Sequence, residues 1–247
     1  MSIDSVAVVT GAARGIGEGI ALRLAEDGWK VAVVDISDGA ADVAEAITSS
    51  GGSAAAFKID ITETESVVRG RQDILDRLGQ PSVLVNNAGW EEIRKFEEGD
   101  DEFWEKIVGI NYLGTLRMCR EFLEDLKTAG DRGRFINIAS DAGRVGSTGE
   151  APYSGAKGGI IAFTKTLARE VARYGPTANV VCPGPTETPL MLQQPEALMA
   201  ALVRSVPFRR LAKPADIANA VSFFASARTN YVTGQTLSVS GGLTMAG

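Results

Sequence analysis

The feature that most constrains this chain is an alternation between short apolar runs, rich in β-branched residues, and longer segments with helical periodicity. The first half contains "SVAVV", "KVAVVDI", "AAAFKID" and "SVLVNN", followed in turn by helical patterns over residues 15–27, 38–50, 63–78 and about 101–127. The second half contains "RFINIAS", a helix over about 152–173, "ANVVCPG", a segment near 190–203, a helix near 214–226, and "QTLSVSGG". This order predicts βαβ units and an α/β fold, a doubly wound parallel sheet of about seven strands with helices on both faces.

The length favours a single unit. At 247 residues the chain has a size that α/β folds commonly reach as one domain, and it contains no internal repeat, low-complexity segment or Pro/Gly/Ser linker. We therefore predict one domain over residues 1–247.

A glycine-rich turn follows the first apolar run. In "TGAARGIG", Gly11, Gly15 and Gly17 would let the backbone turn tightly and let a diphosphate approach the amino end of the next helix, where free N–H groups favour an anion. The spacing differs from the usual G-x-G-x-x-G, and tight strand-to-helix turns use glycine without any ligand. Its place after the first strand favours a dinucleotide site and a Rossmann-type fold.

The second predicted strand ends at Asp35, where a carboxylate can accept hydrogen bonds from the adenosine ribose hydroxyls. The same charge would repel the 2′-phosphate of NADP. Arg14 acts in the opposite direction, because its guanidinium could pair with that phosphate. We predict NAD rather than NADP as the cofactor, since a carboxylate facing a dianion is the larger effect. The alternative for Asp35 is a turn residue that caps the following helix.

Tyr153 and Lys157 lie four residues apart in "YSGAK", so on a helix they share one face. An adjacent ammonium would lower the pKa of the phenol, which could then accept a proton from an alcohol as the carbinol carbon loses a hydride. Ser140 could hold the substrate oxygen. The chain has no histidine, which excludes a Ser-His-Asp triad and the usual zinc sites, and we predict no metal. The alternative is a surface Tyr/Lys pair on an amphipathic helix.

Composition limits the partners. The net charge is −6 and the pI about 4.9, which argues against binding a nucleic-acid backbone. Two distant cysteines suggest neither a disulfide framework nor a metal site, so a reducing, cytoplasmic location is expected. No apolar run is long enough to span a bilayer and no signal peptide is evident, so no membrane partner is expected.

Taken in order, the motifs "TGAARGIG", "NNAG" at 86–89, Asn111, Ser140, "YSGAK" and "PGPTET" at 183–188 resemble those of the short-chain dehydrogenase/reductase family over essentially the whole chain. The resemblance implies that Asn111, Ser140, Tyr153 and Lys157 are catalytic, with Asn111 holding a water that links Lys157 to solvent. On residues alone, Asn111 could instead mark a local helix kink. By position the family's cofactor site corresponds to Gly11, Gly15, Ile16, Gly17, Asp35, Asp60, Ile61, Asn87, Ala88, Gly89, Tyr153, Lys157, Pro183, Gly184, Thr186 and Thr188, beside Arg14.

The resemblance also implies a substrate lid at about 189–206 and a homotetramer, although Ser240 stands where the family's carboxyl-terminal segment often has aspartate. Three stretches, "NNAGW", "ASDAGRVGSTGEAPYSGAKGG" and "VVCPGPTETPL", are similar to the 2-hydroxycyclohexanecarboxyl-CoA dehydrogenase subgroup. They suggest a cyclic hydroxyacyl-CoA alcohol as substrate, with Trp90, Arg144 and Glu150 near it.

Four further alternatives stay open. For Trp90 the alternative is ordinary core packing, and for Arg144 it is a surface charge. The chain could also be a 3-oxoacyl thioester reductase that uses NADPH, or an idle dinucleotide-binding regulator on the same fold.

Overall fold

The computed structural model describes residues 5–189, 191–193 and 195–246. Its strands are β1 (Val6–Thr10), β2 (Lys30–Asp35), β3 (Ser53–Lys58), β4 (Pro81–Asn86), β5 (Arg134–Ile138), β6 (Thr177–Pro183) and β7 (Thr236–Val239). Its α-helices are α1 (Gly15–Glu26), α2 (Gly39–Ser49), α3 (Thr64–Leu78), α4 (Asp101–Val108), α5 (Thr115–Glu121), α6 (Leu123–Thr128), α7 (Ala142–Val145), α8 (Ala151–Val171), α9 (Glu196–Ser205) and α10 (Pro214–Ala225).

These strands form one parallel sheet of seven strands in the order β3-β2-β1-β4-β5-β6-β7, which confirms the predicted α/β fold and its single domain. The order reverses between β1 and β4, because the chain builds β2 and β3 on one side of β1 and the later strands on the other. In open parallel sheets, ligands bind beyond the carboxyl ends of the strands at such a reversal.

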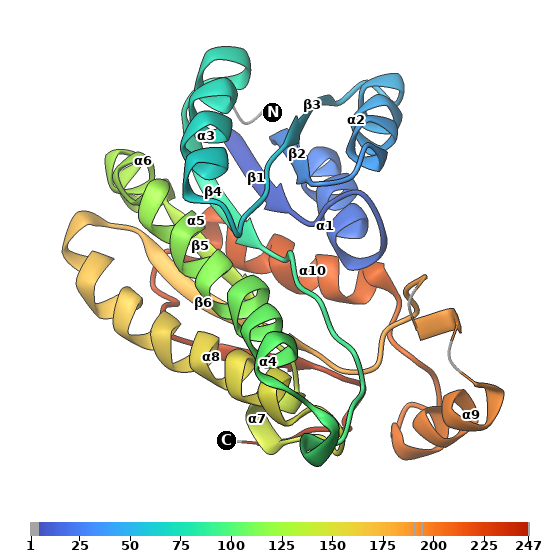
Figure 1. The fold of residues 1–247 in the computed structure, drawn as a ribbon. Helices are drawn as coiled ribbons and strands as arrows, with labels where there is room; N and C mark the ends of the chain where they lie inside the picture. Colours follow the sequence, from blue (N-terminus) through green and yellow to red (C-terminus); the bar gives the residue numbers. More distant parts are fainter. Residues whose placement is uncertain (1–4, 190, 194, 247) are drawn as a thin grey trace.

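Both faces of the sheet are covered, as the continuous apolar runs predict. Successive residues of β1 point to opposite faces: Ala7 and Val9 pack in one core with residues of α1 and α10, whereas Val6 and Val8 pack in another with residues of α3, α5 and α8. Figure 1 shows the same layers, with α4, α5 and α8 on one side of the sheet and α1 and α10 on the other.

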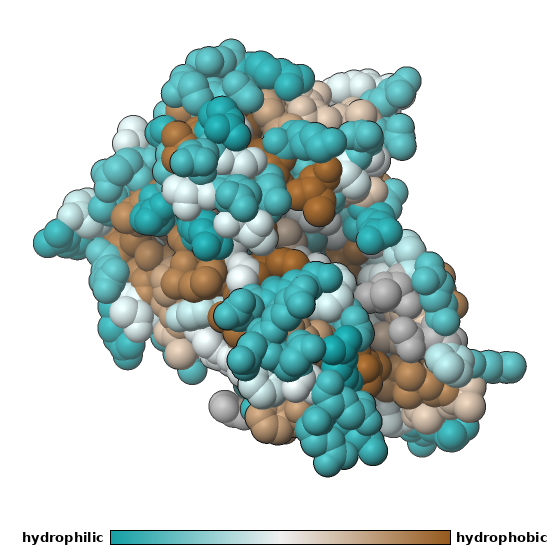
Figure 2. Space-filling view, viewed as in Figure 1, coloured by the Kyte–Doolittle hydropathy of each residue, from teal (hydrophilic) through white to brown (hydrophobic). Residues whose placement is uncertain are grey.

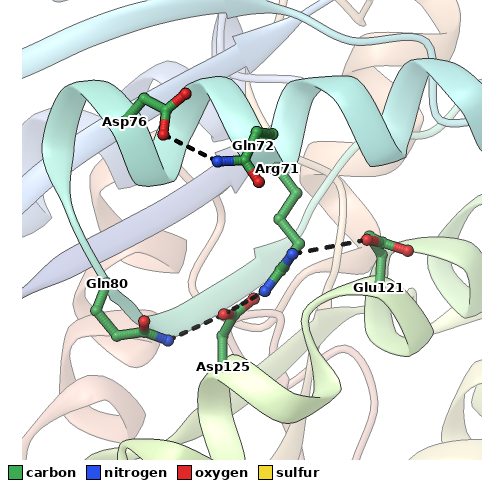
Figure 3. A network of polar contacts seen from close by, with 6 residues as sticks. All are labelled: Arg71, Gln72, Asp76, Gln80, Glu121 and Asp125. Atoms are coloured by element: carbon green, nitrogen blue, oxygen red, sulfur yellow. Dashed lines mark hydrogen bonds and ion pairs between the residues drawn. The ribbon is translucent and has the colours of Figure 1, made fainter.

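A polar network joins α3 to the helices after β4 (Figure 3). The Arg71 guanidinium donates hydrogen bonds to both oxygens of the buried Asp125 carboxylate, at 2.5 and 2.8 Å, and lies 4.0 Å from a Glu121 oxygen. Gln80 donates a further hydrogen bond to Asp125 at 3.0 Å. The Asp125 carboxylate raises the pKa of Arg71. A buried carboxylate is therefore paired and hydrogen-bonded, as burial requires.

Figure 2 shows that the surface over α5 is apolar on the face turned toward the reader. There a groove runs between α5 and α8, lined by the apolar side chains of Leu116, Leu123, Phe163 and Leu167 and by the charged side chains of Arg117, Arg120 and Glu170. Among the described residues, no helix combines the length and the apolar character that crossing a membrane would require.

Candidate active site

The glycine-rich turn is wedged between α1 and the loop after β4. Gly11 has a φ of +63°, and a Cβ there would lie 2.7 Å from Cα of Ala88. A Cβ on Gly17 would lie 2.1 Å from the carbonyl oxygen of Gly11. The Asn87 amide donates hydrogen bonds at 3.0 Å to the carbonyl oxygens of Thr10 and Gly11. The turn therefore tolerates no side chain at residues 11 and 17, and the loop after β4 holds it in place.

The amino end of α1 and the end of β2 meet at this turn. Arg14 is the N-cap residue of α1, in an extended conformation, and no side chain caps the helix, so its first N–H groups keep the capacity to bind an anion. Asp35 accepts a hydrogen bond from the Ala13 N–H at 3.1 Å and two from Ser37 at 3.0 Å. These residues fit a dinucleotide, because the helix end can receive a diphosphate and Asp35 lies beside the turn.

Asp60 and Ile61 follow β3 at the same edge of the sheet. One Asp60 oxygen accepts hydrogen bonds from the backbone N–H and the hydroxyl of Thr62, at 2.8 and 2.6 Å, so this carboxylate shapes its own turn. Ile61 is buried, and a Cβ on Gly114 would lie 2.6 Å from its Cδ1.

The segment after β6 reaches back toward the glycine-rich turn. A Cβ on Gly15, where φ is +61°, would lie 3.5 Å from Cγ2 of Thr188. Gly184 is pressed against Ser240, since a Cβ there would lie 2.7 Å from the Ser240 Cβ, and the Thr186 hydroxyl donates a 2.8 Å hydrogen bond to the Gly184 carbonyl. Parts of the chain far apart in sequence thus border one space.

Asn111 lies in a π-helical segment, η2 (Gly109–Gly114), between α4 and α5. Its buried amide donates hydrogen bonds to the carbonyl oxygens of Trp90 at 2.7 Å and Ile107 at 3.0 Å. A Cβ on Gly89 would lie 2.8 Å from the Asn111 Oδ1 and 3.4 Å from Nζ of Lys157. The kink and the functional role predicted for Asn111 are compatible, because the π-turn is what directs its side chain toward the Gly89 loop. Single π-turns often occur at functional sites.

Ser140, Tyr153 and Lys157 come together at the carboxyl ends of β5 and β6. The Ser140 side chain is near enough to the Tyr153 phenol to lower its pKa, and its hydroxyl accepts a bond from the Ala142 N–H at 3.1 Å. Lys157 is buried, donates a 3.0 Å hydrogen bond to the Ile138 carbonyl and holds its Nζ 5.6 Å from the centre of the Tyr153 ring. The predicted shared face of Tyr153 and Lys157 is present on α8.

The electrostatics of this pair differ from the sequence-based expectation. The pKa of Tyr153 is raised rather than lowered, first because the phenol is buried and then because the Glu91 carboxylate is near; the Ser140 hydrogen bond acts the other way. Burial also lowers the pKa of Lys157 to about 8. The net direction of the Tyr153 pKa is therefore opposite to the one expected from the sequence, because burial and the Glu91 carboxylate determine it, and the effect of Lys157 on the phenol stays a prediction.

The three predicted substrate residues have different surroundings. Trp90 packs edge-on against Phe103, with ring centres 6.1 Å apart, in the apolar cluster that includes Tyr153. The Arg144 guanidinium donates hydrogen bonds to Ser238, at 2.9 Å, and to the Ala246 carbonyl, so it fastens the carboxyl-terminal segment. Glu150 occupies the N-cap position of α8. Their roles toward a substrate stay predictions, and the Arg144 guanidinium is already engaged by the carboxyl-terminal segment.

The predicted lid at 189–206 consists of a short 3₁₀ helix, η5 (Met191–Gln193), and α9, with residues 190 and 194 outside the described part. None of the described residues of α9 itself is buried, and Figure 1 shows this helix apart from the others that cover the sheet. A helix with so few buried contacts opens at little cost. Its movement toward a substrate stays a prediction.

One residue at the site escaped the sequence analysis. Glu91, directly after Trp90, is partly buried, and Glu150 is near enough to influence its pKa. Burial first, and Glu150 second, raise the pKa of Glu91 to about 8. Its place in the acidic stretch "EEIRKFEEGDD" looks like part of a solvated loop, so no sequence signal separates it from its exposed neighbours.

Comparison with known proteins agrees with this geometry. A family model described as "Enoyl-(Acyl carrier protein) reductase" matches residues 11–244. Among curated proteins, the chain is 38% identical to a 3-oxoacyl-[acyl-carrier-protein] reductase FabG of Pseudomonas aeruginosa, over 98% of each chain. It is 34% identical to a (3R)-3-hydroxyacyl-CoA dehydrogenase of Mus musculus, over 98% of this chain and 97% of the relative.

Among solved structures, the chain resembles a single-residue variant of actinorhodin polyketide ketoreductase with NADPH, with a TM-score of 0.92 and 32% identity. The match covers 98% of this chain and 99% of the ketoreductase.

Proposed function

The chain belongs to the short-chain dehydrogenase/reductase family and is an NAD(P)-dependent alcohol/ketone oxidoreductase, and from this premise we propose that it interconverts a secondary alcohol and a ketone carried on an acyl thioester. The proposal rests on one observation: Ser140, Tyr153 and Lys157 lie close together at the edge of the sheet that also holds the glycine-rich turn. An idle regulator would not need this arrangement.

The proposed chemistry assigns one task to each residue. Tyr153 accepts the hydroxyl proton during alcohol oxidation and returns it during ketone reduction. Ser140 holds the substrate oxygen through the hydroxyl that contacts the phenol. Lys157 and Asn111, which both lie next to Gly89, would hold a positive charge and a water molecule behind the phenol. When bound, an oxidised nicotinamide supplies the hydride acceptor and a positively charged ring.

The proposed cofactor site combines the turn and the strand ends. The backbone around Gly11, Gly15 and Gly17, with Ile16 and the open end of α1, would receive the diphosphate. The adenosine half would lie against Asp35, Asp60, Ile61, Asn87, Ala88 and Gly89, and the nicotinamide half against Tyr153, Lys157, Pro183, Gly184, Thr186 and Thr188.

We propose NAD as the preferred cofactor. The Asp35 carboxylate accepts a hydrogen bond from the turn itself, so a 2′-phosphate bound there would face a fixed negative charge. Two observations favour NADPH instead: the similar polyketide ketoreductase was solved with it, and Arg14 is exposed at the start of α1. The ratio of kcat/KM for NAD to that for NADP, measured in the wild type, Asp35→Ala and Arg14→Ala, separates these possibilities.

For the substrate we propose a cyclic hydroxyacyl-CoA. The support is the similarity of the loops around Trp90 and Glu150 to the 2-hydroxycyclohexanecarboxyl-CoA dehydrogenase subgroup, together with the flat Trp90 ring in the Tyr153 cluster. The second candidate, reduction of 3-oxoacyl thioesters with NADPH, is supported by the similarity to the Pseudomonas reductase.

The deciding experiment is a substrate panel. Purified protein is assayed for NADH or NADPH formation with cyclic and straight-chain hydroxyacyl-CoA thioesters, and with the matching acyl-carrier-protein esters, alongside Tyr153→Phe. Turnover restricted to cyclic CoA esters and lost in the variant supports the first candidate. Faster turnover of straight-chain carrier-protein esters with NADPH favours the second.

A homotetramer and a cytoplasmic site of action complete the proposal. The groove between α5 and α8 supports self-association, because its lining includes Leu116 and Phe163 and the surface over α5 is apolar (Figure 2). Light scattering of the purified protein measures the assembly, and a monomeric mass would contradict it.

A further inference from the structure

A buried carboxylate follows Ser140 directly in the chain. Asp141, at the N-cap position of α7, is only 6% exposed. Its backbone N–H donates a 3.0 Å hydrogen bond to the Pro183 carbonyl, and its Oδ2 would lie 3.7 Å from a Cβ on Gly184. The carboxylate therefore lies against the segment that the proposed cofactor site assigns to the nicotinamide half.

The two oxygens of this carboxylate have different surroundings. Oδ1 accepts a 2.5 Å hydrogen bond from the Ser238 hydroxyl, which itself accepts a 2.9 Å bond from the Arg144 guanidinium. Because that hydroxyl gives its hydrogen to Asp141, the carboxylate requires no proton of its own. Oδ2 is buried, and no hydrogen bond from the described residues reaches it. A charged oxygen thus lies without a donor in the interior, where charges act more strongly than in water.

The Arg144 cation offsets only part of this charge. Its guanidinium reaches the Asp141 carboxylate through the Ser238 hydroxyl. The neighbouring Cys182, near the end of β6, shows the balance of the two charges. Burial first, and Asp141 second, raise the pKa of the Cys182 thiol, and the opposing effect of Arg144 is smaller. At the end of β6 the negative charge of Asp141 therefore outweighs the positive charge of Arg144.

We propose that Asp141 is a specificity-determining residue for the oxidation state of the cofactor, because its carboxylate favours the positively charged oxidised nicotinamide over the neutral reduced one. The inference rests on the proposed cofactor site. During ketone reduction a hydride passes from the reduced ring to the ketone carbon, Tyr153 gives a proton to the ketone oxygen, and a positive charge is left on the ring. The fixed negative charge of Asp141 favours this direction. The other charged groups near the phenol, Lys157 and Glu91, have opposite signs and oppose each other.

The expected effect is a change in the ratio of two dissociation constants. A unit charge roughly 10 Å away, in a protein of intermediate polarity, changes a binding constant about tenfold. Since Arg144 offsets part of the charge, Asp141→Asn should raise the ratio of the Kd for NAD to the Kd for NADH about fivefold. The ratio for NADP and NADPH should rise by the same factor, because the nicotinamide halves are identical.

The first test is calorimetric titration of the whole protein without substrate. NAD, NADH, NADP and NADPH give the two ratios, and ADP-ribose, which lacks the nicotinamide, should bind Asp141→Asn with the wild-type Kd. The matched control is Asp73→Asn on the exposed face of α3, which removes the same charge and should leave the ratios unchanged. Wild-type ratios in Asp141→Asn overturn the inference. Failure of every dinucleotide to bind the wild type contradicts the proposed function itself, and the inference with it.

The second test uses Arg144 to separate charge from structure. Arg144→Met removes the cation that offsets Asp141, so it should lower the ratio of the Kd for NAD to the Kd for NADH, opposite to Asp141→Asn. Arg144→Lys keeps the positive charge and should restore a ratio close to that of the wild type, although its ammonium cannot reproduce the guanidinium geometry. If Asp141→Asn and Arg144→Met shift the ratio in the same direction, both residues act only by holding the structure, and the proposal is wrong.

Discussion

Replacing Gly17 by alanine tests whether the glycine-rich turn is as tightly packed as the structure has it. The new Cβ would lie 2.1 Å from the Gly11 carbonyl oxygen and 2.5 Å from Nδ2 of Asn87, well below the 3.0 Å that Cβ atoms keep. Gly11 has little room to move, because even a Cβ on it would lie 2.7 Å from Cα of Ala88. The turn or the loop after β4 must therefore move by roughly 1 Å.

The cost has two parts. Overpacking of this kind costs about 1–3 kcal/mol, and displacing the Asn87 amide weakens two hydrogen bonds, each contributing about 1 kcal/mol. We expect the free energy of unfolding to fall by about 2–4 kcal/mol. If the turn of the variant relaxes outward, dinucleotide binding must restore its original conformation, which costs binding free energy. The Kd for the dinucleotide should therefore rise about 10-fold to 100-fold, since about 1.4 kcal/mol corresponds to each factor of ten.

Urea unfolding and calorimetric titration with NAD and NADP measure the two quantities separately. The matched control is Gly155→Ala, where a Cβ would meet nothing within 4 Å. Because alanine is the better helix former, this control should be more stable by up to about 1 kcal/mol and should bind the dinucleotide normally. If Gly17→Ala keeps both the wild-type stability and the wild-type Kd, the packing argument is wrong.

Four other substitutions test contacts of the site and the core. Tyr153→Phe should lower kcat for oxidation at least about 100-fold while calorimetry still detects dinucleotide binding; near-normal turnover would exclude Tyr153 as the base. Asp35→Ala should shift the NAD/NADP ratio of kcat/KM toward NADP by about tenfold, and an unchanged ratio would assign the choice to another residue. Arg71→Met should reduce the free energy of unfolding by about 3 kcal/mol, because Asp125 stays buried without its cation; a loss below about 1 kcal/mol in urea titration would contradict this. The pKa of Glu91 is raised on folding from 4.5 to about 8, so its contribution to stability is fully present below about pH 4.5 and is lost as pH rises to about 8; urea titrations should show the wild type losing stability relative to Glu91→Gln across this range, and a difference that does not change with pH would contradict the raised pKa.

The strands could be predicted from the sequence because each is buried on both faces and forms an unbroken apolar run. The run "KVAVVDI" became β2 with its end at Asp35, and "ANVVCPG" became β6. The predicted helix over 101–127 instead consists of α4, η2, α5 and α6. The π-turn arises because the Asn111 amide binds backbone from another loop, a tertiary contact that helical periodicity does not encode. The short helix α7 has too few residues to give a periodic signal.

The catalytic candidates could be found because their spacing carries chemical meaning. The helical repeat alone places Tyr153 and Lys157 on one face of a helix. The glycines of the turn indicate that its backbone lies close to another group. The sequence could not predict which hydrogen bonds these side chains make. In the structure the carboxylates of Asp35 and Asp60 accept bonds from the backbone N–H groups of Ala13 and Thr62. Likewise, only the folded chain brings Ser238 within reach of the Arg144 guanidinium.

The charge balance of the site lies beyond sequence reasoning for a physical reason. Spacing predicts which side chains meet, but the pKa of Tyr153 depends first on burial, which is a property of the whole fold. Burial likewise lowers the pKa of Lys157, and the charge of Glu91 acts in the opposite direction. A buried ammonium near a carboxylate costs less than an unpaired one. Glu91, which no sequence signal singles out, therefore helps to keep Lys157 charged inside the protein.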